Sequence, residues 1–176
     1  MAKAKSELPP VIYVDTCVYI DVLTQEPTLH PETEEPRWKS AKALLDAVND
    51  GRVVLATSSL VDAEVGSFAT LRDDGDTFLK KVRGWFDAPP PGTRYVEVDR
   101  MIARDAERLQ KAWRPHAAPG KKMNGADAVH LAASVRLKCD YLMTGDGGFP
   151  VGHTVDGVKV RYAESVWPQT IFDELG

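Results

Sequence analysis

Two aspartates occupy positions directly after apolar runs of the chain, where they could hold a cation. Asp15 follows the apolar residues 11–14, and Asp146 follows residues 141–143 after a Thr-Gly pair. Each aspartate alone is equally well explained as a turn or helix-capping residue. If the two runs are neighbouring strands of a parallel sheet, however, both carboxylates project toward the same edge.

Glu64 lies in the apolar stripe of a predicted helix. Apolar residues recur there at helical spacing, namely Leu60, Val61, Val65 and Phe68. Glu64 falls within that stripe, whereas Asp62 points away from it. A carboxylate on a core-facing stripe costs free energy unless it is paired or binds a metal. The alternative is an edge residue whose carboxylate reaches water.

Asp127 stands near the start of an alanine-rich helix predicted for residues 124–138. With Asn124 as the N-cap, Asp127 takes the third helical position, where a carboxylate interacts favourably with the helix dipole. That explanation suffices for Asp127 alone. The helix is apolar nearly all round, however, so it is predicted to be buried, and Asp127 marks where it meets a cleft.

The four acids indicate a metal site when they are taken together. Carboxylates held close to one another raise one another's pKa, and a bound divalent cation removes that penalty. Ligation by oxygen alone, without His or Cys, favours Mg²⁺ or Mn²⁺ over zinc. The sequence therefore predicts a magnesium or manganese site built from Asp15, Glu64, Asp127 and Asp146.

Along the chain, short apolar runs that are typical of buried strands alternate with patterns typical of helices. The four acids lie in these segments or shortly after them. Strands are predicted at residues 11–14, 53–56, 95–98, 141–143 and 158–160, the last after an Asp-Gly turn signal. Helices are predicted at residues 17–23, 37–49, 59–71, 77–86, 101–113 and 124–138, with 25–36 as a loop. This order predicts an α/β fold with a mainly parallel, buried sheet, in which ligands bind beyond the carboxyl ends of the strands.

Length and composition fit one globular domain. The chain has 176 residues, 43% of them hydrophobic and 27% charged, so we expect a single domain over residues 11–176 with residues 1–10 as an extension. The two cysteines form no zinc-type pair, and no apolar run approaches the roughly 18 residues that span a membrane. We therefore expect a reduced, cytoplasmic protein that does not associate with membranes.

Net charge bears on the class of ligand. The chain carries a formal charge of −4, which counts against a module that binds nucleic acid through bulk positive charge. It does not count against a nuclease, because clustered carboxylates at a metal site lower the net charge.

Four segments of the chain resemble the PIN-domain ribonucleases. They are residues 11–16, 58–64, 126–133 and 141–149, and they occur in the family's order. The resemblance covers roughly residues 11–160 and implies a three-layer α/β/α sandwich with a mainly parallel sheet. It also implies hydrolysis of single-stranded RNA with Mg²⁺ or Mn²⁺, as in the VapC-like toxins of type II toxin–antitoxin systems.

The resemblance assigns roles to individual residues. Asp15 and Asp127 look like the principal metal ligands, and Glu64 and Asp146 look like further ligands, direct or through water. The hydroxyls of Thr16 and Thr144 would orient these carboxylates. Either Glu64 or Asp146 could help to deprotonate the attacking water. Many relatives carry a second aspartate where this chain has Gly148, which leaves open whether one or two metals bind.

Other polar residues suggest weaker hypotheses. A basic loop could hold the RNA backbone through Arg114, Lys121 and Lys122, although a solvated charged loop explains these residues slightly better. His130 is expected to be a hydrogen-bonded core or rim residue and His116 a loop residue, so neither is assigned to the site.

Three functions remain open from the sequence. The first is a toxin ribonuclease that is neutralised by a small antitoxin, which would insert a basic residue or helix into the acidic cleft. The second is a housekeeping PIN ribonuclease of RNA processing with the same site. The third is a PIN-like interaction module without catalytic activity. The resemblance also implies a homodimer, which is common in the family.

Overall fold

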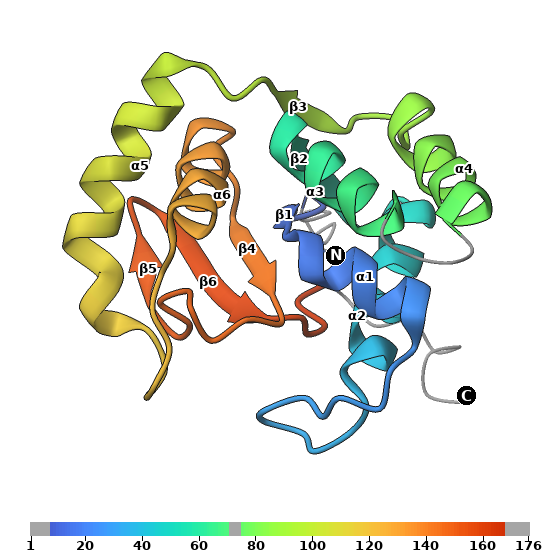
Figure 1. The fold of residues 1–176 in the computed structure, drawn as a ribbon, viewed down its shortest axis with the longest axis horizontal. Coiled ribbons are helices and arrows are strands. Elements are labelled where there is room, and N and C mark those ends of the chain that lie inside the picture. The colour runs from blue at the N-terminus through green and yellow to red at the C-terminus, as the bar shows by residue number, and fades with distance from the viewer. Residues whose placement is uncertain (1–7, 71–74, 168–176) are drawn as a thin grey trace, which may run out of the picture.

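The protein folds into a six-stranded sheet with helices on both faces (Figure 1). The structure is a computed structural model, and it describes residues 8–70 and 75–167. The strands are β1 (Val11–Val14), β2 (Val54–Ser58), β3 (Arg94–Val96), β4 (Tyr141–Thr144), β5 (Thr154–Val155) and β6 (Val158–Tyr162). The helices are α1 (Thr16–Thr24), α2 (Arg37–Asn49), α3 (Ser59–Thr70), α4 (Gly75–Asp87), α5 (Arg100–Trp113) and α6 (Gly125–Arg136), with a short 3₁₀ turn at Arg114–His116.

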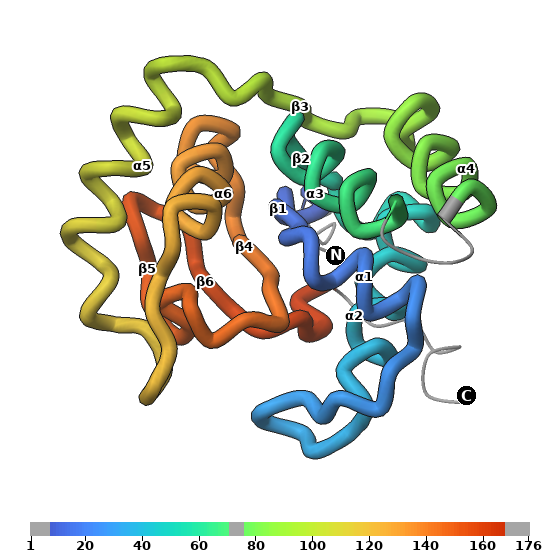
Figure 2. The backbone as a smooth tube through the Cα atoms, in the orientation of Figure 1, coloured from blue at the N-terminus to red at the C-terminus, as the bar shows by residue number. Residues whose placement is uncertain are grey.

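The sheet is parallel except at one edge. Its strand order is β3-β2-β1-β4-β6-β5, and only β5 runs antiparallel to its neighbour. All four residues of β1 are buried, as expected for a central parallel strand covered on both faces. Figure 2 shows β1, near the start of the chain, beside β4, near its end. The predicted fold class, an α/β/α sandwich with a mainly parallel sheet, is confirmed.

The strand order also explains how the helices form two layers. The chain moves outward from β1 to β2 and β3, and then crosses back to β4 on the other side of β1. Because such crossovers are right-handed, the helices of the outward and return connections cover opposite faces. Figure 1 accordingly shows α5 and α6 together on one side and α1 to α4 on the other.

The predicted Asp-Gly turn joins two antiparallel strands, so that residues 154–162 form a β-hairpin. Asp156 and Gly157 both have positive φ, at 46° and 93°, which is the backbone conformation of a tight two-residue hairpin turn. The hairpin adds β5, which the sequence did not indicate. Within residues 8–70 and 75–167, no helix is long and apolar enough to cross a membrane. Residues 1–7 of the expected N-terminal extension lie outside the described residues.

The predicted helix and strand boundaries agree with the observed ones to within two residues, and the ends of β2 and β3 are among those that differ by that amount. Strand β2 continues through Ser58, two residues beyond its predicted end, and α3 begins directly after it at Ser59. Strand β3 ends at Val96 and not at Val98, because the Val98 N–H donates to the Ser59 hydroxyl at 3.0 Å.

The strand order places a crevice at the carboxyl edge of the sheet, where ligands bind in folds of this kind. The connections from β1 and β4 leave in opposite directions, so a crevice opens between the carboxyl ends of these two neighbouring strands. Asp15 and Asp146 follow these two strands.

Candidate active site

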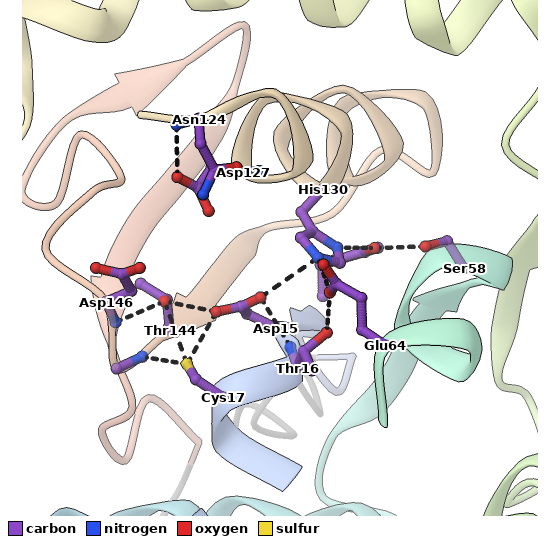
Figure 3. Close-up of polar contacts among 12 residues, drawn as sticks. Asp15, Thr16, Cys17, Ser58, Glu64, Asn124, Asp127, His130, Thr144 and Asp146 are labelled. Carbon is purple, nitrogen blue, oxygen red and sulfur yellow. Dashed lines mark hydrogen bonds and ion pairs between the residues drawn. The ribbon is translucent and has the colours of Figure 1, made fainter. Parts of the chain in front are cut away.

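Four acidic side chains from separate segments line one cleft at the carboxyl ends of β1 and β4. Asp15 follows β1, Glu64 comes from α3, Asp127 from the first turn of α6, and Asp146 from the loop after β4. The cleft has a volume of about 340 Å³. The structure therefore brings together all four acids that the sequence indicated (Figure 3).

Asp15 is held from two sides of the cleft. It is 5% exposed, and its Oδ1 accepts the Thr16 N–H at 2.8 Å, which caps α1. Its Oδ2 accepts the Thr144 hydroxyl at 2.8 Å and the Cys17 thiol at 2.8 Å. Because Thr144 belongs to β4 and Cys17 to α1, the carboxylate orientation depends on both segments.

The loop that carries Asp146 is tied to the same groups. The Asp146 N–H donates to the Thr144 hydroxyl at 2.9 Å, and the Gly145 N–H donates to Cys17 Sγ at 2.9 Å. Burial raises the pKa of Cys17 well above its usual range, and the charge of Asp15 adds to this effect. The thiol therefore stays protonated and links Asp15 to the loop of Asp146.

Asp127 closes a capping box at the start of α6. Its Oδ2 accepts the Asn124 N–H at 2.8 Å, while Asn124 Oδ1 accepts the Asp127 N–H at 2.9 Å. Burial raises the pKa of Asp127; the Asn124 bond opposes this, and the charges of Asp146 and Asp15 raise the pKa further. Ionisation of Asp127 is therefore less favourable here than in water, and a positive charge that enters the cleft would offset this effect.

Glu64 is paired rather than isolated on its apolar stripe. Its Oε2 accepts the Thr16 hydroxyl at 2.5 Å and His130 Nε2 at 2.8 Å (Figure 3). Burial acts to raise the pKa of Glu64, but these two hydrogen bonds outweigh it, so the pKa is lowered. Its side chain is 33% exposed. Glu64 is thus an ionised carboxylate at the mouth of the cleft.

His130 connects this carboxylate to the core. It is 1% exposed, with Nδ1 2.9 Å from the Tyr13 hydroxyl, which lies 2.7 Å from the Ser58 hydroxyl. Since an ionised carboxylate only accepts hydrogen bonds, Nε2 carries the proton that Glu64 binds. Burial acts to lower the pKa of His130, but the bond to Glu64 and the nearby negative charges outweigh it, so the pKa is raised.

His130 is the cleft residue that the sequence analysis set aside. Its expected character as a hydrogen-bonded buried residue is confirmed, but it also lines the cleft and lies 3.6 Å from Asp15. The available signal was its spacing, because Asp127 and His130 are three residues apart and so share a helix face.

The expected orienting hydroxyls and basic residues are placed unequally. Thr144 contacts Asp15 and Thr16 contacts Glu64, as described above. Lys121 lines a neighbouring cavity that also contains Asp146. Arg114 and Lys122 are exposed, and neither lines the acidic cleft or that cavity.

Gly148 occupies the position where the resemblance leads one to expect a second aspartate. A Cβ atom there would lie 3.0 Å from Asp127 Oδ2 and 3.1 Å from the Lys122 carbonyl oxygen. A side chain there would therefore require these two neighbours to shift. In this chain the position is closely packed and carries no fifth carboxylate.

The donor set fits a hard divalent cation, although the side chains do not already surround one. Among residues 8–70 and 75–167, no three His, Cys, Asp or Glu side chains are arranged to share one ion. The carboxylates nevertheless keep free oxygens: in the described part of the chain, no hydrogen-bond donor contacts Asp127 Oδ1, Glu64 Oε1 or Asp146 Oδ2. Oxygen ligands with spare lone pairs suit Mg²⁺ or Mn²⁺.

Comparison with known proteins gives the following matches. The family model described as PIN domain matches residues 12–151. FitAcB from Neisseria gonorrhoeae has a TM-score of 0.57 at 19% identity, over 86% of this chain and 97% of that one. VapC20 from Mycobacterium tuberculosis, described as a sarcin-ricin loop cleaving toxin, has a TM-score of 0.56 at 17% identity, over 82% and 97%.

A further structure, a toxin–antitoxin complex from Klebsiella pneumoniae, has a TM-score of 0.56 at 18% identity, over 84% of this chain and 94% of that one. At these identities the solved structures establish a shared fold. No curated protein gives a significant match.

Proposed function

Because the chain belongs to the PIN domain family, we propose that it is a metal-dependent endoribonuclease that hydrolyses phosphodiester bonds of single-stranded RNA. The observation that carries the proposal is the convergence of Asp15, Glu64, Asp127 and Asp146 in one cleft at the carboxyl edge of the sheet. Acids gathered in this way repel one another, and the helix caps formed by Asp15 and Asp127 do not by themselves require Glu64 and Asp146 beside them. Residues 11–176 would form the nuclease domain.

The proposed cofactor is Mg²⁺ or Mn²⁺. Asp15 and Asp127 would be the principal ligands, and Glu64 and Asp146 would bind directly or through water. A bound cation of this kind would supply Lewis-acid activation of water and stabilise charge on the phosphorane-like transition state. The raised pKa of Asp127 is consistent with the proposal: burial is its largest cause, the charges of Asp146 and Asp15 add to it, and a bound cation would offset both effects.

The chain's own residues would then orient the reaction. The Thr144 and Cys17 donors fix one oxygen of Asp15, while Thr16 and His130 fix one oxygen of Glu64 and leave the other to face the cleft. Glu64, which is ionised and partly exposed, is the acid we propose to accept the proton of the attacking water.

We further propose that the protein is the toxin of a VapBC-like pair. The structures it resembles include a sarcin-ricin loop cleaving toxin and toxin–antitoxin complexes. Its partner would be a small antitoxin that presents a basic side chain to the acidic cleft, where opposite charges favour association. A homodimer and a cytoplasmic location complete this proposal.

Expression in cells and cleavage of purified RNA test the proposal together. We expect the wild-type chain to arrest growth and to cleave single-stranded RNA only with Mg²⁺ or Mn²⁺, and Asp15→Asn to abolish both effects. The matched control is Asp62→Asn, because Asp62 is an exposed acid of α3 outside the cleft.

The outcomes separate the alternatives. Growth arrest that persists in Asp15→Asn would refute a catalytic toxin. Metal-dependent cleavage without growth arrest would favour a housekeeping ribonuclease. Absence of Mg²⁺ and Mn²⁺ binding in calorimetry would favour a non-catalytic PIN-like module.

A further inference from the structure

A second cavity adjoins the acidic cleft on the other side of Asp146. It has a volume of about 420 Å³ and shares Asp146 and Cys17 with the cleft. Its other walls include Arg37, Lys121, Tyr162, Pro31 and Pro119; we call it the Arg37 cavity. Its volume lies within the range of about 300–1,000 Å³ that is usual for ligand pockets.

Arg37 is held in a fixed orientation at this cavity. Its Nε donates to Asp21 at 2.8 Å, and its Nη1 donates to the Gly145 carbonyl oxygen at 3.1 Å. Asp21 is 6% exposed and the Arg37 side chain is 25% exposed, so the pair is buried on the Asp21 side and partly open to solvent on the Arg37 side. A guanidinium has five N–H groups, and the described residues accept only these two, so further donors remain for a ligand.

Close packing at Gly145 supports this placement of the guanidinium. A Cβ atom at Gly145 would lie 3.3 Å from Arg37 Cζ and 3.3 Å from Asp21 Oδ2. The glycine next to Asp146 thus lets Arg37 approach the backbone of the Asp146 loop. The guanidinium is positioned relative to the same loop that carries one of the acids.

Lys121 is tied to the Asp146 loop through the backbone. The Ala118 N–H donates to the Gly147 carbonyl oxygen at 2.8 Å, and the Lys121 N–H donates to the Ala118 carbonyl oxygen at 2.9 Å. A Cβ atom at Gly147 would lie 2.9 Å from Ala118 Cβ, so glycine permits this contact. The exposed ammonium of Lys121 therefore belongs to a segment fixed beside the cavity.

The donors of this cavity suit an anion. Asp21 balances the charge of Arg37, so Arg37 contributes directed donors. Asp146 opposes the charge of Lys121, and a cation bound in the acidic cleft would offset the charge of Asp146. Fixed guanidinium donors and a mobile ammonium are the two groups that proteins use for phosphate. Tyr162, Pro31 and Pro119 supply apolar wall area that suits a ribose or base.

We propose that the Arg37 cavity binds the nucleotide adjacent to the cleaved bond, with its phosphodiester contacting Arg37 and Lys121. This inference rests on the proposed ribonuclease function, because it assigns the path of the same RNA strand across the cleft. The RNA strand then runs from the acidic cleft over Asp146 into the Arg37 cavity, which defines its path across the protein surface.

Binding of a cleavage-resistant RNA tests this assignment. The probe is a fluorescein-labelled, phosphorothioate-linked single-stranded hexanucleotide, and anisotropy is measured on the full chain with Mg²⁺ over a range of salt concentrations. We expect Lys121→Gln to lower affinity roughly tenfold at low salt, as for the loss of one charge-assisted contact. We also expect the slope of log affinity against log salt to fall by about 0.7, the value for one phosphate contact of a single strand.

A second variant tests Arg37 without leaving Asp21 unpaired. The double substitution Asp21→Asn with Arg37→Gln replaces the ion pair by two amides, so we expect it to fold, with an unchanged thermal midpoint, and to lose a similar affinity. Lys81→Gln is the matched control, because Lys81 is an exposed lysine of α4 away from the cleft.

The results distinguish this inference from the proposed function. If the wild-type chain cleaves unmodified RNA with Mg²⁺ while Lys121→Gln and the double variant keep the wild-type affinity and salt slope, the Arg37 cavity is not the subsite and the ribonuclease proposal stands. If the wild-type chain neither binds the hexanucleotide nor cleaves RNA, both proposals are wrong.

Discussion

The acidic cleft and the Arg37 cavity adjoin each other, yet they carry opposite chemistry. Both share Cys17 and Asp146, and their volumes are similar, at about 340 and 420 Å³. Hydroxyl, thiol and backbone donors orient the acids of the first, whereas Asp21 orients the guanidinium of the second. Size would not have identified either one, because an apolar cavity of about 720 Å³ beside Trp85 is larger than both. Under the two proposals above, the cation binds on one side of Asp146 and the RNA phosphate on the other.

Removing one charge from the acidic cleft and one from the Arg37 cavity tests most directly whether the two have separate roles. Asp15→Asn should lower kcat by several powers of ten, on the order of 10³-fold, because the loss of a principal ligand removes several kcal/mol of transition-state stabilisation. Lys121→Gln should raise KM and leave kcat nearly unchanged, because it weakens binding of substrate and transition state equally. Steady-state cleavage of a short RNA measures both constants. A large loss of kcat in Lys121→Gln would contradict the division of roles.

His130 offers a test of how the acidic side is oriented. His130→Phe removes both the bond to Glu64 and the bond to Tyr13, so we expect affinity for Mn²⁺ to fall by about 10–100-fold, as for other groups that orient metal ligands. His130→Gln keeps an N–H donor and should recover part of that loss. Calorimetric titration with Mn²⁺ measures the effect.

A comparison variant separates positioning from general damage to the core. Tyr13→Phe removes the hydroxyl that contacts His130 Nδ1 and Ser58, so it should weaken Mn²⁺ binding less than His130→Phe does. If His130→Phe bound Mn²⁺ as tightly as the wild-type chain, the positioning role of His130 would be excluded.

Adding one methyl group at either of two neighbouring glycines is expected to affect the two cavities differently. Gly148→Ala places a Cβ atom 3.0 Å from Asp127 Oδ2, whereas Gly147→Ala places one 2.9 Å from Ala118 Cβ. Each should cost about 1–3 kcal/mol of stability, as is usual for overpacking. Gly148→Ala should weaken Mn²⁺ binding, and Gly147→Ala should weaken RNA binding with metal affinity retained. If each variant lost Mn²⁺ affinity and RNA affinity equally, the loop that carries Asp146 would respond as one unit and the two cavities would not have separate roles.

The sequence predicted the elements of the molecule that depend on local patterns. The buried run of β1 followed by Asp15 and the capping box of Asn124 with Asp127 are both local, so their placement could be inferred. The stripe of α3 likewise placed Glu64 toward the interior side of its helix. The order of these elements, together with the rule that ligands bind beyond strand ends, predicted the shared edge.

Contacts between distant segments were beyond that reasoning. The meeting of His130 with Glu64 depends on how α6 crosses α3, and the pairing of Arg37 with Asp21 depends on how the loop of residues 25–36 returns. Neither packing angle nor loop path is encoded in residue spacing. The strand β5 was missed for a related reason, since two residues carry too little alternation to indicate a strand.

The smallest expected effect concerns the ionisation of Asp127 in the acidic cleft. The folded-state pKa of Asp127 is raised, chiefly by burial, so its contribution to stability is fully present below the unfolded pKa, about 3.9, and is lost as pH rises through the folded pKa. Asp127→Asn cannot ionise but can still accept the Asn124 N–H. Without metal, the melting temperature of Asp127→Asn relative to the wild-type chain should therefore increase from pH 3 to pH 7, by roughly 2–4 °C per kcal/mol for a chain of this size.

Addition of Mg²⁺ at neutral pH should reverse that order. The cation stabilises the wild-type fold by binding the charged cleft, as any ligand of the native state does, whereas Asp127→Asn lacks a principal ligand and should gain little. Thermal denaturation with and without Mg²⁺ measures both changes. A melting-temperature difference that stays constant between pH 3 and pH 7 would show that the pKa of Asp127 is not raised in the folded protein, either by burial or by the neighbouring charges.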